Sequence, residues 1–177
     1  AAVPLQGLAG YRIEPGAPRT QDGKNFQQET SLSFTPSVQR DQGAEYVCRV
    51  GHVTLQTPLE RRSGELQVTA RAQVSEIQVL PHGEPRDEVP FSIQIQNFYP
   101  RGIHRIQWSC DERAWEQGEP TDCSQNPDHT FSATSVWRIH RRRLNRPDFS
   151  IRVFVQQNPR EPVIKKEIRA GDTGPSP

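Results

Sequence analysis

The chain of 177 residues contains no methionine and only three cysteines, at positions 48, 110 and 123. No run of 18 apolar residues occurs, which excludes a transmembrane helix within this stretch of sequence. Asn-x-Ser/Thr sequences are also absent, so glycosylation gives no indication of secretion. An odd number of cysteines leaves at least one thiol unpaired within a monomer. A chain that begins with Ala1-Ala2-Val3 is expected to be a processed product.

Neither the charge of the chain nor its short motifs indicate a ligand or a catalytic activity. The formal net charge is +1, with both signs interspersed, which argues against nucleic acid or a membrane surface as the partner. The sequence has no nucleophile elbow, no His-Glu-x-x-His and no glycine-rich phosphate loop. Cys48 and His52 have the spacing of two zinc ligands, but no second pair completes a site. We therefore expect no enzymatic activity and no cofactor.

Apolar residues in the second half alternate with polar ones, a period of two that is typical of β-strands with one buried face. In the clearest stretch, Phe91, Ile93 and Ile95 share one face. The same alternation recurs at 106–110, 131–139, 151–155 and 163–168, and more weakly at 73–80. Turn residues separate these stretches, as in the Pro-His-Gly-Glu-Pro run at 81–85. The pattern predicts an all-β sandwich or barrel.

The first half shows a shorter series of the same kind. Its alternating stretches lie at 32–34, 46–50 and 64–69. A turn is expected at 37–43, and residues 71–73 are expected to join the two halves tightly, since no low-complexity linker separates them. The last residues, 170–177, are rich in glycine and proline and read as a disordered tail.

Four motifs follow one another along the chain: Asp41-x-Gly43-x-x-Tyr46-x-Cys48, Cys48-x-Val50-x-His52, Asn97-Phe98-Tyr99-Pro100 with Trp108, and Thr130-Phe131-Ser132-Ala133-Thr134-Ser135. Together they resemble the C1 set of the immunoglobulin superfamily, over roughly residues 22–168. The two motifs around Cys48 are similar to its E–F corner and strand F. The motif at 97–100 is similar to the end of strand B, with Trp108 as the Trp of strand C, and the motif at 130–135 is similar to strand E. A tyrosine two residues before the cysteine can send its hydroxyl back to the backbone of the corner.

The resemblance implies antiparallel sandwiches in tandem: a partial C1-like domain over 1–70, a complete one over 71–169, and a tail or stalk over 170–177. It implies protein–protein recognition in immunity, as the extracellular part of a cell-surface receptor or ligand similar to signal-regulatory proteins or to ligands of natural cytotoxicity receptors. Two alternatives stay open: an assembly chaperone of the tapasin type in the lumen of the secretory pathway, and a constant region of an antibody or antigen receptor. In each case the expected partner is another protein, and a homodimer or heterodimer is compatible with all three. Direct membrane insertion by this segment is not expected.

The second unit departs from the family in its cysteines. By motif position, Ile93 and Val153 stand where the two cysteines of the disulfide between strands B and F are found, next to the core residue Trp108. Cys110 and Cys123 offer a replacement. A bridge between them would close a loop of about fifteen residues and contribute ~3 kcal/mol.

The first unit is too short for a whole domain, because only 47 residues precede Cys48. Strands A and B are expected to be missing, with 5–13 as strand C and 20–26 as the approach from strand D to strand E. Tyr46 is expected in the core of this unit. Cys48 then has no partner in its own domain, and is either a free thiol or a bridge to a second chain.

Two groups of residues are candidates for contact with a partner. Trp115 lies in the segment between Cys110 and Cys123 and is either an exposed anchor or a cap on the sandwich. Arg141, Arg142 and Arg143 form the strongest run of charge, together with His140, Arg138 and Arg146. This run is either a site for an anionic partner, such as heparan sulfate or an acidic protein surface, or a solvated loop.

Overall fold

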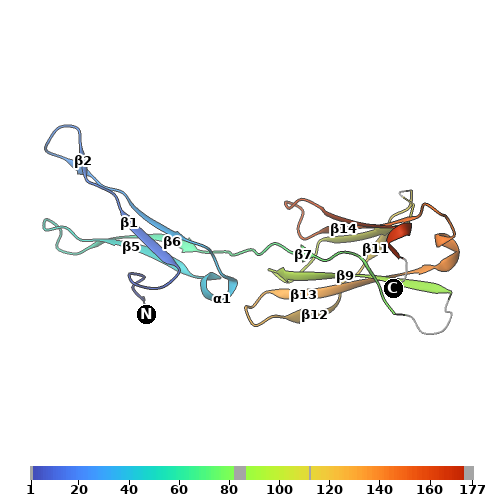
Figure 1. Cartoon of the computed structure of the whole chain (residues 1–177). Coiled ribbons are helices and arrows are strands. Elements are labelled where there is room, and N and C mark those ends of the chain that lie inside the picture. The colour runs from blue at the N-terminus through green and yellow to red at the C-terminus, as the bar shows by residue number, and fades with distance from the viewer. Residues whose placement is uncertain (1, 82–86, 112, 174–177) are drawn as a thin grey trace.

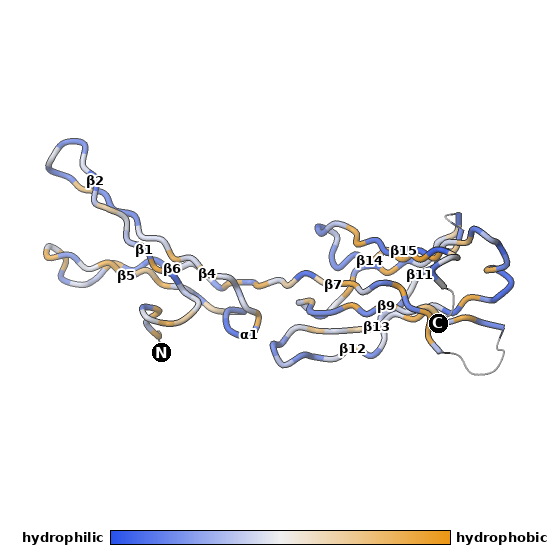
Figure 2. Tube along the Cα trace, in the orientation of Figure 1, coloured by the Kyte–Doolittle hydropathy of each residue, from blue (hydrophilic) through white to orange (hydrophobic). Residues whose placement is uncertain are grey.

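The computed structural model describes residues 2–81, 87–111 and 113–173 (Figure 1). The turn expected at 81–85 lies almost wholly outside the described residues, as does the end of the tail at 174–177. The prediction of an all-β fold with antiparallel sheets is confirmed, and the architecture is compatible with an immunoglobulin-like sandwich. Figure 2 shows that hydrophobic residues are spread over many short stretches between hydrophilic ones. No helix among the described residues has the length and apolar character needed to cross a bilayer.

The strands before residue 70 form three two-stranded sheets, β1–β4, β2–β3 and β5–β6. The elements of this group are β1 (Tyr11–Pro15), β2 (Arg19–Thr20), β3 (Phe26–Gln27), β4 (Thr30–Phe34), α1 (Val38–Asp41), β5 (Glu45–Val50) and β6 (Leu59–Glu65). One expectation is wrong: the segment 5–13 does not supply a strand C. In the C1 set, strand C pairs with strand F, which the Cys48 motif predicts at the position of β5, whereas β1 pairs with β4.

The strands after residue 72 form two larger sheets. Their elements are β7 (Gln73–Val74), β8 (Gln78–Val79), β9 (Glu88–Phe98), β10 (Arg105–Ser109), β11 (Glu116–Gly118), β12 (Thr121–Gln125), β13 (Phe131–His140), η1 (Arg141–Leu144), β14 (Ser150–Gln156), β15 (Ile164–Arg169) and η2 (Ala170–Thr173). One sheet has the order β11-β10-β14-β15, and the other has the order β12-β13-β9-β7, with β8 also pairing with β9. Figure 1 shows the two as facing layers.

Two expected elements differ in detail. The weakly alternating stretch at 73–80 is divided into β7 and β8, because the chain leaves the ladder between them while Ile77 enters the core. The expected tail does not begin at residue 170, since residues 170–173 form the 3₁₀ turn η2. The N–H of Ala170 donates to the carbonyl of Phe149 at 3.0 Å, which fixes the start of this turn on the sandwich.

The core of the second group lies between its two sheets, where the alternating residues of β9, β10, β13 and β14 meet. Trp108 and Trp137 stack there with ring centroids 5.7 Å apart, and the indole N–H of Trp108 donates to the hydroxyl of Ser135 at 3.2 Å. Ile93 is the register partner of Ser135, and Val153 is that of Trp108. The contact between Trp108 and Ser135 therefore places Ile93 and Val153, both fully buried, at the same level of the core.

Gly118 in β11 permits close packing over this core. It is the register partner of Ile106, beside the indole of Trp108. A Cβ atom at position 118 would lie 2.9 Å from Cδ1 of Trp108, which is too close for a van der Waals contact. The edge strand β11 can cover Trp108 only because this residue has no side chain.

Gln157 ties the joint between the two groups to the second sandwich. Its side-chain amide donates to the carbonyl of Ala70 at 2.7 Å, and its side-chain oxygen accepts from the N–H of Ala72 at 2.8 Å. Ala70 and Tyr99 also exchange two backbone hydrogen bonds. Since buried peptide groups need partners, the Gln157 side chain and the bonds between Ala70 and Tyr99 together fix the path of the chain at the joint.

The first group is held by a polar cluster around Asp41. The hydroxyls of Tyr11 and Tyr46 donate to its carboxylate at 2.6 and 2.5 Å, and the guanidinium of Arg40 pairs with it at 3.1 Å. Burial raises the pKa of Asp41, but hydrogen bonds from Arg40 and the two tyrosines outweigh it and hold the pKa well below its usual range. Tyr46 also contacts Phe34, with centroids 5.0 Å apart.

Two expectations for Tyr46 need correction. Its hydroxyl bonds the side chain of Asp41 and not the backbone of the corner. Its side chain is half-buried, in contact with Tyr11 of β1 and Phe34 of β4, and not in a closed core. Burial and the hydrogen bond to Asp41 raise the pKa of Tyr46.

Candidate functional site

An aromatic pair lies on the outer face of the sheet β11-β10-β14-β15. Phe154 in β14 points away from the core, because it lies between the buried residues Val153 and Val155. The indole of Trp115, in the segment between β10 and β11, stacks on Phe154 with centroids 4.2 Å apart and 28° between the planes. The ammonium of Lys165, the register partner of Phe154 in β15, lies 5.2 Å from the centroid of the Phe154 ring. The structure thus places Trp115 on a sheet face, half-buried.

Polar side chains border this aromatic pair. Arg152 and Glu167 form an ion pair at 3.3 Å on the neighbouring strands β14 and β15. The hydroxyl of Ser150 also donates to Glu167, and this bond, aided by Arg152 and Arg169, holds the pKa of Glu167 below its usual range. An aromatic centre with a charged border is the arrangement found at many protein–protein contacts.

The arginine run lies at the opposite end of the second group from the joint, after β13. Its first residues form the 3₁₀ helix η1, in which Arg141, Arg142 and Arg143 are exposed. The ring of His140 accepts a hydrogen bond from the N–H of Arg142 at 3.2 Å and so caps the start of the helix. The segment expected to be a loop is therefore ordered by its own side chains.

Arg143 has a partner that the sequence did not indicate. Its guanidinium pairs with the carboxylate of Glu116 at 2.6 Å, and it lies 5.6 Å from the centroid of the Trp137 ring. The indole N–H of Trp137 donates to the same carboxylate at 2.9 Å. Arg143 and Trp137 together hold the pKa of Glu116 below its usual range. These contacts join β11, β13 and η1, and no local pattern in the sequence marks Glu116 for this role.

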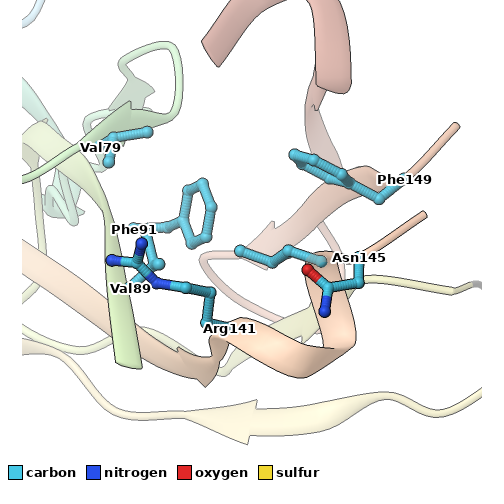
Figure 3. Close-up of a pocket in the computed structure, with 7 residues that line it drawn as sticks. Val79, Val89, Phe91, Arg141, Asn145 and Phe149 are labelled. Atoms are coloured by element: carbon cyan, nitrogen blue, oxygen red, sulfur yellow. The ribbon is translucent and has the colours of Figure 1, made fainter. Parts of the chain in front are cut away.

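A cavity of about 320 Å³ lies beside η1 (Figure 3). Its lining residues are Val79, Val89, Phe91, Arg141, Leu144, Asn145 and Phe149. Apolar side chains make up most of this lining, with one guanidinium and one amide. The volume lies at the lower end of the range for small-molecule sites, and few polar groups converge on it. The lining therefore suits an apolar group better than a polar metabolite.

The bridge expected between Cys110 and Cys123 is not formed. All three cysteines are free thiols: Cys48 is exposed, Cys110 is buried and Cys123 is half-buried. Cys110 lies near Arg143, beyond the end of β13, and Cys123 lies beside the first residues of β13, near Ser132. At about 3.3 Å per residue along a strand, this places the two thiols near opposite ends of β13. The Cα atoms of a disulfide lie within about 7 Å of one another.

Metal binding finds no support in the described residues, which contain no group of three His, Cys, Asp or Glu side chains that could hold an ion. Cys48 and His52 are not joined by further ligands. The side chain of His52 instead bonds to Thr54, with its Nδ1 atom 2.7 Å from the Thr54 hydroxyl.

Comparison with known proteins adds no assignment. No protein-family model matches the chain. No curated protein matches it significantly. The residue motifs, the sheet order and the surfaces described above are therefore the basis for a function.

Proposed function

We propose that this chain belongs to the C1 set of the immunoglobulin superfamily and acts in protein–protein recognition in immunity, as the extracellular part of a cell-surface receptor or ligand. The sheet order supports the family. With β9 as strand B and β14 as strand F, the two sheets have the orders D-E-B-A and C′-C-F-G; the first is that of the constant type, and the second is the C-F-G sheet of the constant type with the short strand β11 added at its edge. The motif Asn97–Pro100 closes β9, and Trp108 lies on β10, as the family pattern requires.

The aromatic pair of Trp115 and Phe154 carries the functional part of the proposal. A Trp on an outer sheet face needs a reason, because large aromatic side chains are usually buried or take part in contacts. Stacking on Phe154 fixes the Trp115 ring before a partner arrives, so little side-chain entropy is lost on binding. Lys165 and the ion pair of Arg152 with Glu167 supply the polar border.

The framework under this face is rigid, which suits display of a binding surface. Phe154 is flanked on β14 by two fully buried valines, and β14 lies between β10 and β15 in the sheet. The Glu116 network fixes β11, the strand that follows Trp115. Recognition residues held by such a framework keep their geometry between the free and bound states.

The proposal is tested by substituting Trp115→Ala in the full chain. Binding is screened by surface plasmon resonance against a panel of extracellular domains of immune-cell proteins. We expect the affinity for the partner found in this screen to fall at least tenfold, about 1.4 kcal/mol, since a Trp at the centre of an interface contributes about 2 kcal/mol or more.

The matched control is Phe26→Ala, which removes an aromatic ring that is 65% exposed in the first group of strands. This variant should bind as the wild type does. Unchanged binding of Trp115→Ala, with an unchanged melting temperature, would contradict the assignment of this face. Absence of binding to every domain of the panel would contradict the proposed role in recognition.

A further inference from the structure

The strand β5 has a free edge. It pairs with β6 on one side, and no strand among the described residues pairs with its other side. The same is true of β4, whose one neighbour is β1. Such edges present unpaired N–H and C=O groups to any strand that approaches. Two-stranded sheets are also marginally stable by themselves, so a further strand would stabilise both hairpins.

The backbone groups at the free edge of β5 can be identified. The N–H of Tyr46 donates to the hydroxyl of Ser63 in β6 at 2.9 Å, so it faces β6. Successive backbone groups of a strand face opposite sides, and the N–H of Cys48 therefore also faces β6. The N–H and C=O groups of Val47 and Arg49 face the free edge.

Three of the six side chains of β5, Val47, Cys48 and Val50, are apolar and exposed, and the two charged ones, Glu45 and Arg49, pair with residues of β6. Val47 and Val50 are 39% and 51% exposed, and Cys48 lies exposed between them. The strand contains no proline or lysine, residues that commonly protect free edges. Arg49 already pairs with Glu60 of β6 at 2.7 Å, so its charge is held on the side away from the free edge.

We propose that β5 pairs with β5 of a second copy of this chain, antiparallel, about a two-fold axis at Cys48. In this register Val47 pairs with Arg49 of the second copy, and these are the residues whose backbone groups face the edge. Tyr46 meets Val50 of the second copy on the apolar face. Arg49 opposes Val47 and Glu45 opposes Gly51, so no like charges meet across the axis, and the edge is complementary to itself.

The register brings the two Cys48 residues opposite each other. They form a non-hydrogen-bonded pair, whose Cα atoms are about 4.5 Å apart in antiparallel sheets. This separation lies within the range of a disulfide. With glutathione disulfide as the oxidant, the two Cys48 thiols exchange to one Cys48–Cys48 bond and release two molecules of reduced glutathione.

The test is sedimentation velocity on the full chain under reducing conditions, compared with the variant Val47→Pro. The N–H of Val47 serves only the free edge, so proline leaves the ladder to β6 intact. We expect the wild type to sediment at twice the chain mass of 20.1 kDa and Val47→Pro at the single mass, with the same circular dichroism. The control Val53→Pro, in a loop and 97% exposed, should remain dimeric.

Incubation with glutathione disulfide, followed by peptide mapping, examines the register. A Cys48–Cys48 peptide is expected in the wild type, and Cys48→Ser should remain a noncovalent dimer. The proposal is overturned by a monomeric wild type at all concentrations, by a dimer that Val47→Pro leaves unchanged, or by Cys48 linked only to glutathione. The variant Trp115→Ala should dimerise as the wild type does, which separates this surface from the recognition face.

Discussion

The double substitution Ile93→Cys with Val153→Cys should create a disulfide between the sheets of the second sandwich. The two side chains are fully buried and lie at the same level of the core, because their register partners Ser135 and Trp108 are hydrogen-bonded to each other. β9 and β14 belong to different sheets, so the bond would cross the core. The native chain fills this place with aliphatic side chains next to the stacked indoles of Trp108 and Trp137.

Two opposing terms set the expected magnitude. The new bond closes a loop of about 60 residues, for which chain entropy gives a stabilisation of ~4 kcal/mol. The substitutions remove the equivalent of about three buried methylene groups at ~0.8 kcal/mol each, about 2.4 kcal/mol before any cavity term. The reduced variant should therefore be about 2–3 kcal/mol less stable than the wild type. The oxidised variant should be more stable than the wild type by about 1–2 kcal/mol.

Urea unfolding followed by tryptophan fluorescence measures these differences, since Trp108 and Trp137 are buried in the same core. The background carries Cys48→Ser, Cys110→Ala and Cys123→Ala, so that one bridge is possible. Each sample is measured with and without a reductant, and the matched control is the single variant Ile93→Cys. Failure of the double variant to form an intramolecular bridge in air would refute the facing arrangement of β9 and β14 inferred from the core contacts.

Two further predictions concern buried polar groups. Asp41→Asn should lower the free energy of unfolding by about 2 kcal/mol at pH 7, because charged hydrogen bonds from Arg40 and two tyrosines are weakened. The pKa of Asp41 is depressed in the folded state, so this stabilisation is fully present above about pH 4 and is lost as the pH falls further. The melting temperatures of variant and wild type should therefore approach each other in acid. A difference in melting temperature that stays constant with pH would contradict the reasoning. Gln157→Ala should leave the buried N–H of Ala72 unpaired and remove one of the two hydrogen bonds to the carbonyl of Ala70, and so accelerate limited cleavage by trypsin after Arg71, which is measured by mass spectrometry. The control Gln107→Ala, on the outer sheet face, should be cleaved at the wild-type rate.

Much of the second sandwich could be predicted from the sequence alone. The alternation at 91–95, with Trp108 and the stretch at 131–139, specified which side chains enter the core, and the structure places them there. The alternation at 151–155 likewise assigns Phe154 to the face opposite Val153 and Val155, and the structure places it on the outer face. These predictions succeed because side-chain direction in a strand depends on a local period of two and needs no knowledge of the neighbouring strand.

Contacts between distant residues could not be predicted in this way. The bridge expected between Cys110 and Cys123 rested on their spacing, and the sheets carry the two thiols toward opposite ends of β13. The pairing of β1 with β4 likewise depended on sheet register. Proximity along the chain does not determine which strand edges meet.

The sequence by itself determined that this protein is built from short strands and that the main strands of the second sandwich bury one face each, because a residue period of two encodes side-chain direction directly. Only the tertiary structure decided that Trp115 stacks on Phe154, that Glu116 joins Arg143 to Trp137, and that β5 has a free edge. The physical reason is the same in each case. These features depend on whether strands that are far apart in the sequence pair with each other. Sheet register determines that pairing, and the local alternation of apolar and polar residues does not.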